Sequence, residues 1–62
     1  MKFTIDIVRP NGRLLHCAVV EETDPMRAKT KAENLLSTWR ERGASTARLF
    51  SQKGEEIYIL KR

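Results

Sequence analysis

The adjacent residues His16 and Cys17 are the first candidates for chemistry in this sequence. A thiol nucleophile with an imidazole base, or two metal ligands, would use these residue types. They fall within residues 13–20, an apolar run typical of a β-strand, and successive side chains of a strand point to opposite faces. The two side chains therefore cannot converge on one atom, and one His with one Cys is too few ligands for a metal. We expect Cys17 to be a small core residue and His16 to face Asp6 across a hairpin.

The other polar residues do not form a catalytic pattern either. Glu21-Glu22 and Glu55-Glu56 are neighbouring carboxylates, but each pair points two ways or lies in a loop. The three glycines are isolated from one another, so there is no glycine-rich loop to bind phosphate. A core of this size has little room for a ligand pocket. We therefore expect no enzymatic activity, no cofactor, no bound metal and no small-molecule substrate.

Residues 24–42 have the pattern of an amphipathic helix. Asp24 can accept hydrogen bonds from the first-turn N–H groups, and Pro25 suits the first helical position. Gly43 follows as a stop signal. Apolar residues recur at helical spacing and form one stripe. The stripe consists of Ala28, Ala32, Leu35, Leu36 and Trp39.

Strands are expected on both sides of this helix, within a single domain spanning residues 1–62. Alternating or continuous apolar residues predict strands at 2–9 and 13–20 before the helix, and at 45–51 and 55–61 after it. Each pair of strands is joined by a short glycine-containing turn, which is typical of a hairpin.

The turn of the first hairpin decides which side chains are buried. A two-residue turn at Asn11-Gly12 would pair Ile7 with His16 and put a histidine in the core. A three-residue loop places Pro10 and Gly12 where such loops favour them, and it makes one face entirely apolar. Because a shift of one residue reverses every side chain, we predict the three-residue loop with a bulge. The expected pairs are Ile7 with Leu15, Ile5 with Cys17 and Phe3 with Val19.

The second hairpin is expected to repeat this arrangement around Gln52-Lys53-Gly54. The equivalent pairing sets Leu49 opposite Ile57 and Ala47 opposite Ile59 on the core face.

The order hairpin, helix, hairpin predicts an α+β fold of type ββαββ, with one helix packed on one face of a four-stranded mixed sheet. The first and fourth strands have the densest apolar content, so we place them side by side in the middle, with a right-handed crossover through the helix. This layout resembles the β-grasp arrangement of small immunoglobulin-binding bacterial domains and ubiquitin-like proteins in its element order. The resemblance implies a fold and no functional residue. A fully antiparallel sheet is the alternative topology.

One helix leaves the other face of the sheet uncovered, and that face is more apolar than a solvated face usually is. Long neighbouring side chains could shield it, a second copy of the chain could cover it, or another molecule could bind there. A twofold dimer would give a chain of 62 residues a second core. The expected interface residues are Val8, Leu14, His16, Val20, Arg48, Phe50, Tyr58 and Leu60.

Nucleic acid is the alternative partner. Phe50 and Tyr58 could stack on bases, with positive charge from Arg48, His16 and Lys61. Asp6 and Glu56 on the same face would repel phosphate. The candidate contacts are Lys29, Lys31, Arg40, Arg42, Arg48 and Lys61.

Composition narrows the class of protein further. The net charge of +4 permits nucleic-acid binding without requiring it. The chain has one cysteine, no signal peptide and no apolar run long enough to cross a membrane, which predicts a cytoplasmic protein. The strand that follows almost directly after Met1 indicates a complete small protein. We expect a non-enzymatic binding protein that acts as a homodimer or with a protein partner.

Overall fold

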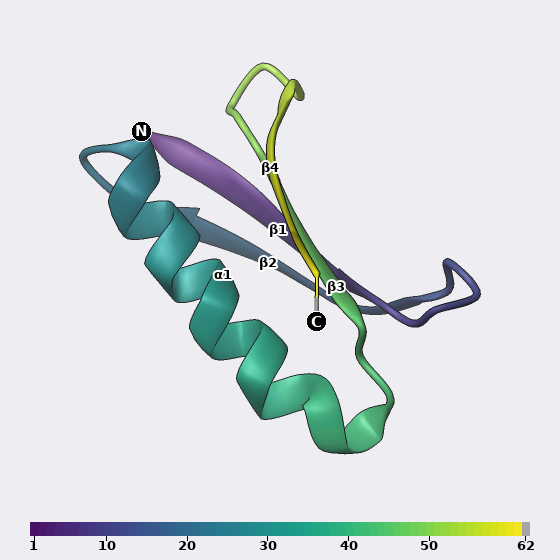
Figure 1. Cartoon of the computed structure of the whole chain (residues 1–62). Coiled ribbons are helices and arrows are strands. Elements are labelled where there is room, and N and C mark those ends of the chain that lie inside the picture. Colours follow the sequence, from purple (N-terminus) through teal and green to yellow (C-terminus); the bar gives the residue numbers. More distant parts are fainter. Residues whose placement is uncertain (62) are drawn as a thin grey trace.

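The computed structural model describes residues 1–61, and Arg62 lies outside the described part. Within residues 1–61, four strands form one sheet, and a single α-helix lies on one side of it (Figure 1). The α+β class and the one-sided helix are confirmed. The elements are β1 (Lys2–Val8), β2 (Leu14–Glu21), α1 (Pro25–Trp39), the 3-10 turn η1 (Arg40–Arg42), β3 (Thr46–Phe50) and β4 (Glu56–Lys61).

The helix begins and ends where the sequence signals predict. The Asp24 side chain accepts a hydrogen bond from the Arg27 N–H at 3.0 Å, and Pro25 occupies the first turn. The α-helix stops at Trp39, and the expected final turn over residues 40–42 is 3-10. Gly43 follows with φ of +95°, a left-handed conformation that closes the helix.

The sheet order is β2-β1-β3-β4, and every neighbouring pair is antiparallel. The predicted mixed sheet, with the first and fourth strands adjacent, is wrong, and so is the β-grasp layout that went with it. The fully antiparallel alternative is correct. β1 lies against β3, the other strand of the second hairpin.

Side-chain size explains why β3, and not β4, is central. The helix has to lie close over the middle of the sheet, and its buried face is built from the small residues Ala28 and Ala32. β3 offers Ala47 and Leu49, both fully buried. The core-side residues of β4 are Tyr58 and Leu60, which are large and only half-buried, and at the sheet edge they fit beside the helix.

The turn of the first hairpin is the predicted three-residue loop. The Gly12 N–H donates to the Arg9 carbonyl at 2.8 Å, and the Arg9 N–H donates to the Arg13 carbonyl at 2.9 Å. Gly12 has φ of +86°, a conformation that is strained for any residue with a Cβ. Val8 pairs with Leu14, as the loop requires.

One residue farther along, the predicted register fails. Leu15 is a bulge residue: Val8 pairs with Leu14, but Ile7 pairs with His16. The extra residue shifts all later pairs by one and reverses the faces of β2. The expected pairs Ile7 with Leu15, Ile5 with Cys17 and Phe3 with Val19 are therefore wrong. The observed pairs are Ile7 with His16, Ile5 with Ala18 and Phe3 with Val20.

The second hairpin repeats both devices. Gly54 has φ of +89°, its N–H donates to the Ser51 carbonyl at 2.9 Å, and Ile57 is the bulge residue. The expected pairs Leu49 with Ile57 and Ala47 with Ile59 are wrong for the same reason. The observed pairs are Leu49 with Tyr58, Ala47 with Leu60 and Arg48 with Ile59.

The two hairpins therefore correspond residue by residue at constant spacing. Gly12 corresponds to Gly54, Leu15 to Ile57 and His16 to Tyr58. Because β1 and β3 are antiparallel neighbours, the two hairpins are related by an approximate twofold axis between these strands. The helix lies on the core side of the sheet, where it contacts β3, β1 and β4 most closely.

Candidate interaction surface on the open face

The face of the sheet opposite the helix, called the open face below, has no element of residues 1–61 over it (Figure 1). The pairing of the strands arranges its side chains in three rows that cross all four strands, and Lys2 and Glu21 lie beyond them at one end of β1 and β2. The middle row is Cys17, Asp6, Arg48 and Ile59. The outer rows are Leu14, Val8, Thr46 and Lys61 on one side, and Val19, Thr4, Phe50 and Glu56 on the other.

Half of the residues expected at an interface lie on this face. Val8, Leu14, Arg48 and Phe50 are on the open face, as predicted. His16, Val20, Tyr58 and Leu60 are instead on the helix side, because the two bulges reverse the outer strands.

The open-face residues that the sequence reasoning missed are Cys17, Val19, Glu21 and Ile59. In β2, Leu14 to Val20 contains no alternation of polar and apolar side chains, so the pattern cannot show which face is buried. The bulge is what decides it. The sequence does contain one signal for the bulges: an aromatic residue follows each of them directly, His16 after Leu15 and Tyr58 after Ile57.

The open face is strongly apolar at the outer strands. Val19 is 67% exposed, Leu14 58% and Ile59 48%. These are three of the five large apolar side chains that are exposed among residues 1–61. A strand with apolar residues on both faces is typical of one that is covered on both sides, yet β2 is at the sheet edge.

The open face carries charged residues on both hairpins, namely Lys2, Asp6 and Glu21 on β1 and β2, and Arg48, Glu56 and Lys61 on β3 and β4. The Arg48 Nε donates to the Glu56 Oε1 at 2.9 Å, and the Arg48 guanidinium carbon lies 5.6 Å from the Phe50 ring centroid. Asp6 is the cross-strand neighbour of Arg48, and no ion pair among residues 1–61 joins the two. The middle row therefore has one negative and one positive side chain, side by side.

Cys17 is exposed, so the expectation of a core cysteine is wrong. Its cross-strand partner is Asp6, the neighbour that had been expected for His16. Hydrogen bonding to Asp6, with smaller effects from burial and from the negative charge of Asp6, raises the pKa of the Cys17 thiol. A raised pKa makes the thiol less reactive at neutral pH. His16 and Cys17 lie on opposite faces, as the strand geometry predicts.

The two aromatic side chains that follow the bulges, His16 and Tyr58, contact opposite ends of the helix. The His16 ring stacks on Trp39 with centroids 4.8 Å apart. The Tyr58 hydroxyl donates to the Met26 Sδ at 3.7 Å, and the Lys29 Nζ lies 5.0 Å from the Tyr58 ring centroid. His16 and Tyr58 therefore pack within the fold and do not present their rings on the open face.

The six cations proposed to contact nucleic acid are divided among several partners. Lys31 pairs with Glu22 at 2.6 Å, and the Arg42 guanidinium carbon lies 5.3 Å from the Trp39 ring centroid. Arg48 is paired with Glu56. The remaining cations border one hollow.

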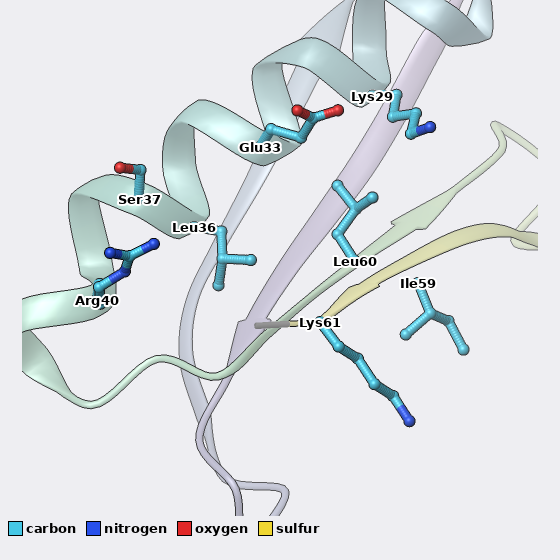
Figure 2. A pocket seen from close by; sticks show the side chains of 8 residues that line it. All are labelled: Lys29, Glu33, Leu36, Ser37, Arg40, Ile59, Leu60 and Lys61. Carbon is cyan, nitrogen blue, oxygen red and sulfur yellow. The ribbon is translucent and has the colours of Figure 1, made fainter.

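That hollow lies between α1 and β4 and has a volume of about 430 Å³ (Figure 2). Lys29, Arg40 and Lys61 border it, together with the Glu33 carboxylate. Figure 2 shows Leu60 pointing toward the helix, whereas Lys61 points away from it. The three cations therefore do not converge on one point.

No group of three or more His, Cys, Asp or Glu side chains within residues 1–61 is arranged to hold a metal ion. Over the same residues, no helix is long and apolar enough to cross a membrane. Comparison with protein-family models, with curated proteins and with solved structures gives no match.

Proposed function

We propose that this chain is a small non-enzymatic binding protein that self-associates by packing the open faces of two copies together. The observation that carries the proposal is the exposure of Leu14, Val19 and Ile59 on that one face. Water contact with these side chains is unfavourable, and covering them recovers about 25 cal/mol for each Å² of apolar surface buried.

The size of the face fits a second copy. The molecule measures 29 × 18 × 15 Å, so the open face offers on the order of 500 Å² per copy, and a pair would bury about 1,000 Å². That area is at the lower end for specific protein interfaces. We expect a dissociation constant on the order of micromolar, so both monomer and dimer would be present at ordinary concentrations.

Sedimentation across a concentration series tests the proposal. The mass should rise toward that of a dimer with concentration, and Val19→Glu or Ile59→Glu should hold the chain monomeric. Met26→Glu is a matched control, because Met26 is 61% exposed and lies on the helix. A monomer mass for wild type up to about 1 mM would rule out the proposal, since that is far above the expected dissociation constant.

Nucleic acid is the second candidate partner, and the hollow between α1 and β4 supports it. Lys29, Arg40 and Lys61 take part in none of the ion pairs found among residues 1–61. If they contact phosphates, affinity for a mixed-sequence oligonucleotide should fall steeply with salt, and Arg40→Gln should reduce the slope of that dependence by about one. NMR amide peaks that do not move when the oligonucleotide is added would rule out this candidate.

A further inference from the structure

We infer that the two copies pack with their twofold axis perpendicular to the strands, so that β2 of one copy lies over β2 of the other and β4 lies over β4. This inference rests on the proposed self-association and specifies its geometry. It follows from the unequal distribution of apolar and charged residues over the open face.

The two edges of the open face differ in character. From Leu14 to Val19, the open face of β2 carries Leu14, Cys17 and Val19, all exposed and none charged at neutral pH, and Glu21 follows at the end of the strand beside Lys2. On the β4 edge, an acidic and a basic residue lie at opposite ends, with Ile59 between them. The acid is Glu56 and the base is Lys61.

A twofold axis perpendicular to the strands passes through the middle row and exchanges the two outer rows. On the β2 edge, Leu14 of each copy then lies over Val19 of the other, and Cys17 lies over Cys17. Uncharged side chains cover uncharged side chains from Leu14 to Val19, and Glu21 lies beyond this overlap at the end of β2. On the β4 edge, Glu56 of each copy lies over Lys61 of the other, which sets opposite charges together twice.

An axis parallel to the strands gives a poorer match. It would place β2 of one copy over β4 of the other, so that Val19 covers Glu56 and Leu14 covers Lys61. Both contacts remove water from a charged group and supply no new opposite charge. Glu56 keeps its ion pair with Arg48, but Lys61 has no ion-pair partner among residues 1–61, so its contact with Leu14 is the costly one. Its one advantage is at the centre, where Asp6 would lie over Arg48.

The middle row tolerates the perpendicular axis. Asp6 would then lie over Asp6 of the second copy, but Arg48 is its cross-strand neighbour in its own sheet. Asp6 therefore has the Arg48 cation on the adjacent strand. Arg48 would likewise lie over Arg48 of the second copy, but each guanidinium is paired with Glu56 of its own chain at 2.9 Å. Stacked sheets lie about 10 Å apart, twice the spacing of adjacent strands, so the like charges are the more distant pair.

A thiol cross-linking experiment tests the axis with exposed positions only. A bis-maleimide with a span of about 10 Å, matched to the spacing of stacked sheets, is added to three proteins above the dimer dissociation constant. These are wild type, Cys17→Ser/Ile59→Cys, and Ile59→Cys with the native thiol retained. Position 17 and position 59 lie on opposite edges of the sheet, three strand spacings or about 14 Å apart.

We expect wild type and Cys17→Ser/Ile59→Cys each to give a covalent dimer, because each position lies over itself. An axis parallel to the strands predicts the opposite result, because it places position 17 over position 59. Neither single-thiol protein is then linked, and only Ile59→Cys, which has both thiols, gives a covalent dimer. That outcome would overturn the inference and leave the proposed function intact. A Cys17→Ser/Thr30→Cys control, with its thiol exposed on the helix, reports collisional linking and should remain monomeric.

Sedimentation of the same three proteins separates the two claims. If wild type sediments as a monomer at every concentration, both the proposed function and this geometry are wrong. If it self-associates and the yield of linked dimer for both single-thiol proteins is no higher than that of the control, only the geometry is wrong. Linking of both single-thiol proteins at least about tenfold above the control is the supporting result, since proximity raises the effective concentration.

Discussion

The two hairpins of this protein have the same backbone conformation but few identical residues. Both have a three-residue turn that ends in a left-handed glycine, and both have a bulge at the second residue of the outer strand. The turn residues before the glycine are Pro10-Asn11 in one and Gln52-Lys53 in the other. The two hairpins thus have in common the left-handed glycine of the turn and the extra residue of the bulge, while the turn residues before the glycine differ.

What differs is the surface that each outer strand presents. On the open face β2 carries Leu14, Cys17 and Val19, at positions where β4 carries Glu56, Ile59 and Lys61. At these three equivalent positions β2 is uncharged and β4 is charged at two, although β2 carries Glu21 at its end. This difference supports both the proposed self-association and its geometry, because a symmetric sheet would not distinguish between the two axes.

The largest expected effect concerns Ile5 and Ala47, which occupy equivalent positions and are both fully buried. Ile5→Ala should lower the free energy of unfolding by about 3 kcal/mol, because it leaves a cavity. Ala47→Ile should cost about 2 kcal/mol by overpacking under the helix. Urea titration followed by circular dichroism measures both, with Thr30→Ala on the exposed helix surface as the control. A negligible loss for Ala47→Ile would show that the helix does not lie close over β3.

The next effect tests whether the two turns are equivalent. A Cβ at Gly12 or Gly54 would meet no atom within 4 Å, so only the left-handed backbone opposes a substitution. Gly12→Ala and Gly54→Ala should therefore each cost about 1 kcal/mol, and by similar amounts. Gly12→Asn should cost less, since Asn tolerates this conformation better than Ala. Clearly unequal losses for the two alanine variants, measured by urea titration, would contradict the equivalence.

Much of this fold can be predicted from local signals. Asp24, Pro25 and Gly43 locate the helix, and Gly12 and Gly54 locate the turns, because each of these residues suits a backbone conformation that few others adopt as well. The element order and the one-sided helix follow from these signals and from the apolar stripe.

The strand order and the register could not be predicted in the same way. Both candidate sheets place the second hairpin beside β1, and they differ only in which of its strands makes the contact. Ala47 belongs to the same buried cluster as Ala28 and Ala32, and packing between a strand and a helix is not a local property of the sequence. The register failed because two bulges each add one residue, and a rule based on alternation assumes uninterrupted pairing.

The candidate site was predicted as a face but not as a set of residues. The open face is apolar in the observed register as well as in the predicted one, because β2 has apolar residues on both faces and Val19 lies where Val20 was expected. On β4, Ile59 lies on the open face where Tyr58 was expected. The aromatic residues moved to the helix side, where His16 contacts Trp39, and this contact forms only in the bulged register.

A smaller effect tests the aromatic contacts at the two helix ends. His16→Ala should lower the free energy of unfolding by about 1 kcal/mol, through loss of the stacking on Trp39. It should also change the Trp39 fluorescence, since Trp39 is the only tryptophan in the chain. Tyr58→Phe keeps the ring and removes only the hydroxyl that donates to Met26, so about 0.5 kcal/mol is expected. Unchanged fluorescence in His16→Ala would indicate that the ring does not stack on Trp39.

The smallest expected effect is on Cys17, which lies beside Asp6 on the open face. Asp6 raises the pKa of the thiol, because it accepts the thiol hydrogen bond and because its negative charge disfavours the thiolate. Asp6→Asn removes the charge, so the pKa should fall, and at mildly alkaline pH a larger fraction of the thiol should be ionised. Alkylation by iodoacetamide should then be faster, with its midpoint shifted to lower pH.

Protein kept dilute enough to be monomeric separates this effect from dimer formation. Glu21→Gln removes a carboxylate elsewhere on β2 and should leave the midpoint in place. If Asp6→Asn also left the midpoint unchanged, Cys17 and Asp6 would not be neighbours, and the bulge at Leu15 that pairs them would be in doubt.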